Sequence, residues 1–167
     1  MSSAGLISSL ADMRGVKVGH WSDSGAKTGC TVILLDKPCV ASVHVSGGAP
    51  GSSETDLLDP SCLVTSVDAI LLTGGSAFGL EACAGVRRYL EEKGRGFNAA
   101  GRLVPIVPAA VIFDLAQGDG AVRPGSKEGY MACQGARSSC AEEGAIGAGT
   151  GAMVGKYMGM ENSSQGG

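Results

Sequence analysis

Apolar runs of different length alternate with glycine-rich turns along the chain, and they predict both strands and helices. The short runs Thr31–Asp36 and Cys39–Val45 are joined by the dipeptide KP and predict a β-hairpin. The almost wholly apolar run Val67–Thr73 predicts a buried strand, and Val104–Leu115 predicts a strand with proline interruptions.

A longer helix is expected from about Ala77 to Lys93, because Ala82, Val86 and Leu90 recur on one helical face. Gly94 follows directly and is a typical helix stop.

A second helix is expected to follow Ser126 as its cap and to run through Ala136. The alternation of strands and helices indicates a mixed α/β domain. We expect residues 1–14 to be an N-terminal extension, 15–160 to be a single α/β domain and 161–167 to be a mobile tail.

Composition narrows the class of protein. The chain contains 28 glycines, carries a formal charge of −3 and has no basic run, so nucleic acids and acidic membranes are unexpected partners. No apolar run is long enough to span a membrane and no signal peptide is recognisable, so a cytoplasmic location is expected. The six cysteines lack paired spacing and are expected to be reduced and mostly buried. Neither a metal nor a cofactor is predicted.

The stretch GGSAFG, residues 74–79, follows the predicted buried strand. It misses a dinucleotide-binding motif because Ser76 stands where a glycine is needed, and it misses a nucleophile elbow because Phe78 stands in the last place. What remains is a helix N-terminus with exposed backbone N–H groups and Ser76 as its expected cap, and such an end attracts negative charge.

A second glycine-rich stretch, Gly147–Ala152, fits a relaxed dinucleotide motif, but no good strand precedes it. A phosphate-binding Walker loop ending at Lys156 would need a serine or threonine where Tyr157 stands. Lys156 could still orient a hydroxyl nucleophile or stabilise developing negative charge, although spacing alone favours a solvated lysine.

The turn-rich loop 46–60 contains Glu54, Asp56 and Asp59, which could act as acid, base or metal ligands but more often cap turns. His44 could act as a base. No Ser–His–Asp set can be assigned from the chain.

Taken together, six stretches resemble the L-aminopeptidase/D-esterase family of self-processing hydrolases, which includes hydrolases of nylon oligomers and of pantetheine amides. They are GVKVGHW, TGCTVIL, SGGAPGSSETDLLDP, LLTGGSAFGLEACAGVRRYLEEKGRGF, VPIVPAAVIFDL and GAGTGAMVGK. The resemblance implies a four-layer α/β/β/α sandwich and a precursor that cuts itself into an α chain and a β chain. The N-terminal Ser, Thr or Cys of the β chain would be the nucleophile.

The resemblance further implies that this chain is an α subunit, with a β chain of the same precursor as its partner. The αβ units would form a homo-oligomer that acts on a small amide or peptide substrate. GGSAFG would be a turn that seats a helix behind the active site, where Gly75 and Ser76, together with Val111, are expected to border the bound substrate.

Three positions are carried over from the family. Lys156 matches a lysine that lies beside the nucleophile in the nylon-oligomer branch. Phe113 matches an oxyanion-stabilising tyrosine, a hydrogen bond that phenylalanine cannot donate. Val111 matches a glutamate that holds the substrate's free amine, which puts strict aminopeptidase activity in doubt. An acyltransferase on the same fold and a non-enzymatic anion-binding domain remain alternatives.

Overall fold

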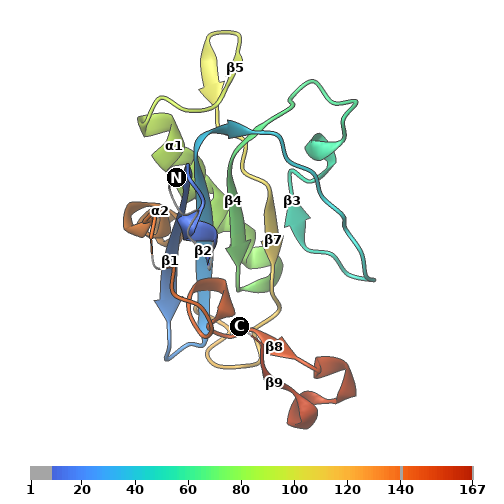
Figure 1. Cartoon of the computed structure of the whole chain (residues 1–167). Coiled ribbons are helices and arrows are strands. Elements are labelled where there is room, and N and C mark those ends of the chain that lie inside the picture. The colour runs from blue at the N-terminus through green and yellow to red at the C-terminus, as the bar shows by residue number, and fades with distance from the viewer. Residues whose placement is uncertain (1–8, 140, 167) are drawn as a thin grey trace, which may run out of the picture.

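The computed structural model describes residues 9–139 and 141–166 of the chain (Figure 1). Its main sheet has five strands in the order β1-β2-β4-β7-β3. All neighbours pair antiparallel except β4 and β7, which are parallel. The strands are β1 Val16–Asp23, β2 Thr28–Cys39, β3 Ser52–Ser53, β4 Val67–Thr73 and β7 Ala109–Val111.

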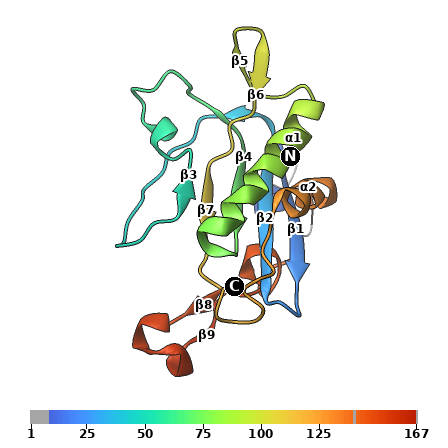
Figure 2. The same cartoon turned by 180° about the vertical axis from the view of Figure 1, so that it is seen from behind.

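Two α-helices, α1 Ala82–Glu92 and α2 Ser126–Gly135, lie over one face of this sheet (Figure 2). Two small ribbons extend beyond its ends: β5 Phe97–Ala99 with β6 Arg102–Val104, and β8 Met153–Val154 with β9 Ser164–Gln165. Short 3-10 helices complete the fold: η1 Leu10–Asp12, η2 Asp56–Leu58, η3 Ser76–Glu81, η4 Gly147–Gly149, η5 Lys156–Met158 and η6 Met160–Asn162.

The hydrophobic core lies between the sheet and the two helices. In β2 and β4 every second side chain points towards the helices, so Val32 and Leu71 face each other on that side and are fully buried. Val86 and Leu90 of α1 belong to the same buried cluster and pack against these strand residues, as expected from the predicted apolar face of the helix. Small and medium aliphatic side chains therefore fill the interior.

The opposite face of the sheet carries apolar side chains that no α-helix covers. Ile33 pairs with Ile70, and both are half-buried, while Leu72 on the same face is 39% exposed. The two α-helices cover one face only, so the described residues form one main sheet with one helical layer beside the two small ribbons. The mixed α/β class is confirmed, and the four-layer sandwich stays a prediction.

The predicted hairpin is wrong. Thr28–Cys39 is one continuous strand, β2, and residues 40–45 form no strand. The antiparallel partner of β2 is β1, which pairs Val16 with Leu35 and Asp23 with Thr28. Pro38 lies beyond the part of β2 that pairs with β1, where a missing N–H removes no bond to that strand. Similarly, only Ala109–Val111 of the predicted strand Val104–Leu115 is paired as β7.

Both predicted helix caps are also wrong. Ser76 is the first residue of η3, has a φ of 51° and makes no capping hydrogen bond through its side chain. The α-helix begins only at Ala82. At α2 the capping position is Gly125, whose N–H donates to Glu128 Oε2 at 3.0 Å, and Ser126 is the first helical residue. The predicted C-terminal stop is correct, since α1 ends at Glu92 and Gly94 has a φ of 66°.

Residues 15–160 include all five strands of the main sheet and both α-helices. The C-terminal residues include η6 and β9, and their predicted mobility stays a prediction, as does the extension 1–14, which falls largely outside the described residues. Within residues 9–139 and 141–166, no helix is long and apolar enough to cross a membrane.

Candidate functional site

The candidate site lies where the parallel strands β4 and β7 end. Thr73 and Val111 are paired at the last position of these strands, and the N–H of Ile112 donates to Thr73 O at 2.8 Å. The segments that follow the two strands therefore leave the sheet side by side. Carboxyl ends of parallel strands are the usual place for ligand sites in α/β proteins.

The turn after β4 is held by the segment after β7. Gly75 has a φ of 80°, and its N–H donates to Asp114 Oδ1 at 2.7 Å. The N–H of Ser76 donates to Ile112 O at 3.1 Å. A carboxylate of the chain itself thus satisfies the Gly75 N–H at this helix start, which weakens the idea that the turn binds an external anion.

Asp114 is buried, with 3% of its surface exposed. Its second oxygen, Oδ2, accepts a hydrogen bond of 2.7 Å from the Thr28 hydroxyl at the start of β2. A Cβ atom on Gly74 would lie 2.0 Å from that oxygen, so only glycine leaves room for the carboxylate. Hydrogen bonds to an ionised carboxylate are about twice as strong as those between neutral groups, and this pair therefore fixes the turn firmly.

Lys156 reaches the same end of the sheet from the C-terminal ribbon, which lies beyond the ends of β4 and β7 (Figure 1). Its ammonium Nζ donates to the backbone oxygen of Phe113 at 2.6 Å. The same nitrogen lies 5.6 Å from the centroid of the Phe113 ring. The structure thus brings together two of the residues that the sequence singled out.

Val111 borders a neighbouring hollow of about 290 Å³, which is also lined by His44, Ser46 and Gly51. The N–H of Val111 donates to Gly51 O at 2.9 Å, and this bond holds the loop after β2 against β7. Among the described residues, no Asp or Glu side chain lines this hollow. His44 is exposed and lies in a segment without strand structure.

The acidic loop is mainly structural. Glu54 forms an ion pair of 2.8 Å with Arg87 of α1 and accepts a bond of 2.7 Å from the N–H of Val107. Asp59 accepts bonds from the hydroxyl and N–H of Ser61, and these bonds hold the pKa of its carboxyl below the ordinary value. Among residues 9–139 and 141–166, no cluster of His, Cys, Asp and Glu could hold a metal ion.

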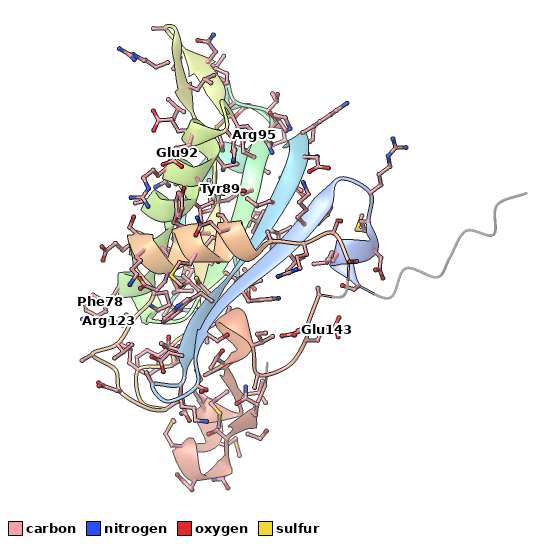
Figure 3. The ribbon with its side chains drawn as sticks, turned by 90° about the vertical axis from the view of Figure 1, so that its left-hand side faces the viewer. Phe78, Tyr89, Glu92, Arg95, Arg123 and Glu143 are labelled. Carbon is pink, nitrogen blue, oxygen red and sulfur yellow. The ribbon has the colours of Figure 1, made fainter. Side chains whose placement is uncertain are left out.

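Beside the Gly75 turn, Arg123 stacks on Phe78. The guanidinium carbon lies 4.1 Å from the ring centroid, and Figure 3 shows the two side chains together where η3 begins. Phe78 is 59% exposed, so the stack lies at the surface. Phe78, the residue that excludes a nucleophile elbow, therefore makes a cation–π contact with the guanidinium of Arg123.

His20 of β1 supports the glycine-rich segment before Lys156. Its Nδ1 lies 2.9 Å from Thr31 Oγ1, which also accepts the N–H of Ala148 at 3.0 Å. Its Nε2 is buried without a hydrogen-bond partner among the described residues. Burial lowers the pKa of His20, and the nearby Glu142 acts in the opposite direction with a smaller effect.

The five candidate site residues from the sequence, Val111, Phe113, Lys156, Gly75 and Ser76, all lie at this end of the sheet. Sequence reasoning missed Asp114 and Thr28. The sequence did offer a signal for Asp114, because an acidic residue follows the apolar run Val111–Phe113 directly. Nothing in the local sequence indicates that Asp114 pairs with Thr28.

Comparison with known proteins gives a consistent picture. Residues 8–165 match the profile of peptidase family S58. Over 168 residues the chain is 45% identical to an uncharacterized aminopeptidase of Mycobacterium leprae, covering 92% of this chain and 46% of that protein. Over 148 residues it is 34% identical to a 6-aminohexanoate-oligomer endohydrolase of a Kocuria species, covering 87% of this chain and 38% of that enzyme.

Solved structures show the fold. An L-aminopeptidase D-Ala-esterase/amidase from Ochrobactrum anthropi, described as a variant of the Ntn hydrolase fold, matches with a TM-score of 0.66 and 23% identity over 85% of this chain and 43% of that one. A Burkholderia β-aminopeptidase matches with a TM-score of 0.60 and 25% identity over 85% and 42% of the two chains. The chain thus spans less than half the length of these relatives.

Proposed function

The chain belongs to peptidase family S58, and from this premise we propose that it is the α-subunit part of an amide or peptide hydrolase. The nucleophile is the N-terminal Ser, Thr or Cys of a β chain that the same precursor releases by cutting itself. The αβ unit assembles into larger homo-oligomers. The hydrolase class is supported by the aminopeptidase and endohydrolase relatives.

The observation that carries the proposal is the position of the Lys156 ammonium. It lies at the carboxyl ends of β4 and β7 and is held by the Phe113 carbonyl. A positive charge fixed at such a place can stabilise the oxyanion that forms when a hydroxyl or thiol attacks an amide carbonyl. It can also favour the deprotonated form of that nucleophile.

The uncovered face of the sheet supports a partner chain. Ile33, Ile70 and Leu72 present apolar surface on the side opposite the helices. Covering this surface with a second sheet would remove it from water, which is a main driving force of chain association. A β chain that supplies this second sheet would also bring its N-terminus into the same molecule as Lys156.

The substrate class follows from Val111 and its hollow. The apolar Val111 offers no carboxylate to a free amine, so the substrate is a small amide, ester or peptide whose amine is not essential. Nothing in the chain's charge favours a nucleic-acid substrate.

The test compares the chain alone with the chain expressed together with its downstream segment. We expect a purified Met1–Gly167 chain to leave a chromogenic amide intact, and the co-expressed αβ unit to hydrolyse it. Replacing the first residue of the β chain by alanine should abolish both self-cleavage and hydrolysis. Robust hydrolysis by Met1–Gly167 alone would overturn the subunit assignment.

The same preparation distinguishes a hydrolase from an acyltransferase. Both form an acyl-enzyme with loss of the leaving amine, and the acyl group then passes to water or to an acceptor amine. Adding hydroxylamine would give a hydroxamate in place of the acid. A hydrolase should release the acid at a comparable rate without any acceptor, whereas a transferase should depend on it.

A further inference from the structure

We propose that Asp114 is a positioning residue for Lys156, which acts through the backbone rather than by contact with substrate. Its effect on catalysis rests on the proposed function, but its effect on the local structure does not.

The geometry excludes a direct role in acid–base catalysis. Asp114 is 3% exposed, and each of its oxygens already accepts a hydrogen bond of 2.7 Å, from Gly75 and from Thr28. In the part of the chain that the structure describes, no Lys, Arg or His forms an ion pair with it. A buried carboxylate whose two oxygens both accept hydrogen bonds from the protein cannot contact a substrate. We therefore infer that Asp114 positions the residues bonded to it.

Those neighbours include the acceptor of the Lys156 hydrogen bond. Phe113 directly precedes Asp114, and its carbonyl oxygen binds the Lys156 ammonium at 2.6 Å. Because Asp114 is tied to both β2 and the turn after β4, the peptide unit between residues 113 and 114 has little freedom to rotate. The position of the carbonyl oxygen therefore depends on the Asp114 carboxylate.

Asp114 also contacts the glycine-rich segment that leads to Lys156. A Cβ atom on Gly151 would lie 2.9 Å from Asp114 Cβ and 1.8 Å from Lys27 O, so the segment packs directly on Asp114 and on the residue before β2. Both sides of this hydrogen bond thus depend on Asp114: the acceptor through the two bonds of its carboxylate, and the segment that carries the donor through packing on its Cβ atom.

The catalytic test uses the αβ unit and a chromogenic amide. Asp114→Ala should lower kcat by about tenfold. Asp114→Asn should keep kcat within about threefold of the wild type, because the amide oxygen accepts from Gly75 and the amide NH2 donates to the Thr28 hydroxyl, although both bonds become weaker. Thr28→Val, which removes one of the two bonds, should fall between them.

A double-mutant cycle separates positioning from general destabilisation. In a Lys156→Ala background, Asp114→Ala should cause no further loss of kcat, because the group that it positions is gone. The same tenfold loss in both backgrounds would overturn the proposal, as would an unchanged kcat in Asp114→Ala. Asp68→Asn is the matched control: this carboxylate is equally buried but holds Arg95 and Ile106 at the other end of β4, so the variant should unfold more easily without a lower kcat.

Hydrogen exchange tests the positioning without any activity. Peptides covering residues 147–158 should exchange faster in Asp114→Ala than in the wild type, and at the wild-type rate in Asp68→Asn. If Asp114→Ala does not fold, Asp114→Asn and Thr28→Val take its place in both measurements. Unchanged exchange in Thr28→Val and in any folded Asp114 variant would overturn the proposal, whereas a wild type that hydrolyses no amide would count only against the proposed function.

Discussion

The ammonium of Lys156 is bound to the backbone oxygen of Phe113, not to the side chain of an acidic residue. The two residues are 43 positions apart and come from the C-terminal ribbon and from the end of β7. A backbone acceptor leaves the positive charge of the lysine uncompensated. The charge is therefore available to a reacting group, which an ion pair with a carboxylate would have prevented.

Lys156→Ala should reduce kcat of the αβ unit at least about tenfold, equivalent to about 1.4 kcal/mol of transition-state stabilisation. Lys156→Arg should not restore it, because the planar guanidinium is larger and cannot take the place of a compact ammonium. Steady-state hydrolysis of a chromogenic amide measures both. Lys127→Ala is the control, since Lys127 is exposed on α2 away from this hydrogen bond. Full activity of Lys156→Ala would contradict the prediction and would show that this lysine is only a solvated surface group.

The free amine of a substrate should matter little, because Val111 provides no negative charge to bind it. An amino-acid p-nitroanilide and its N-acetylated form should have values of kcat/KM within about tenfold of each other, a difference of less than about 1.4 kcal/mol. Val111→Glu should shift the preference towards the free amine. A strict requirement for the amine in the wild type would contradict this prediction and would point to Glu54, Asp56 or Asp59 as the binding group.

Stability should fall as the pH drops below about 6.5, the ordinary pKa of histidine. The pKa of His20 is lower in the folded chain because the ring is buried, so the unfolded chain binds a proton first. The free energy of unfolding then decreases between the unfolded and the folded pKa and levels off below the latter. His20→Asn cannot titrate and should lose this part of the pH dependence in urea unfolding. His44→Asn, at an exposed position, should keep it.

The cysteine thiols should react at very different rates. Burial raises the pKa of Cys30 and of Cys133 to about 12, so almost no thiolate is present near neutral pH. Cys83 is also buried, whereas Cys39 is exposed and Cys62 is half-buried. A thiol reagent should modify Cys39 and Cys62 first, with peptide mass spectrometry to assign each site.

The five described cysteines are free in the structure, and three of them, Cys30, Cys83 and Cys133, are buried, whereas their reduced state stays a prediction. Cys140 lies outside the described residues. After denaturation without reductant, all six thiols of the chain should titrate. A smaller number would show a disulfide.

Hydrophobic periodicity predicted the strand at Val67–Thr73 and the C-terminal half of the helix before Gly94, because both are decided by local burial. It failed at residues 40–45, where β-forming residues lie on a loop instead of pairing. The caps failed for a related reason. Ser76 takes a left-handed conformation since tertiary bonds from Asp114 and Ile112 hold the turn, and no local pattern reports such bonds.

The hydrogen bond from the Gly147 N–H to the Ser22 hydroxyl spans 125 residues, and the one from Ala148 to Thr31 spans 117. On a ribosome, β1, β2 and β4 can therefore pair long before the segment that leads to Lys156 has emerged. The ordered site is among the last parts of this chain to form. A nascent chain thus has a sheet and a helical layer while it still lacks a fixed ammonium, so no functional centre exists during most of its synthesis.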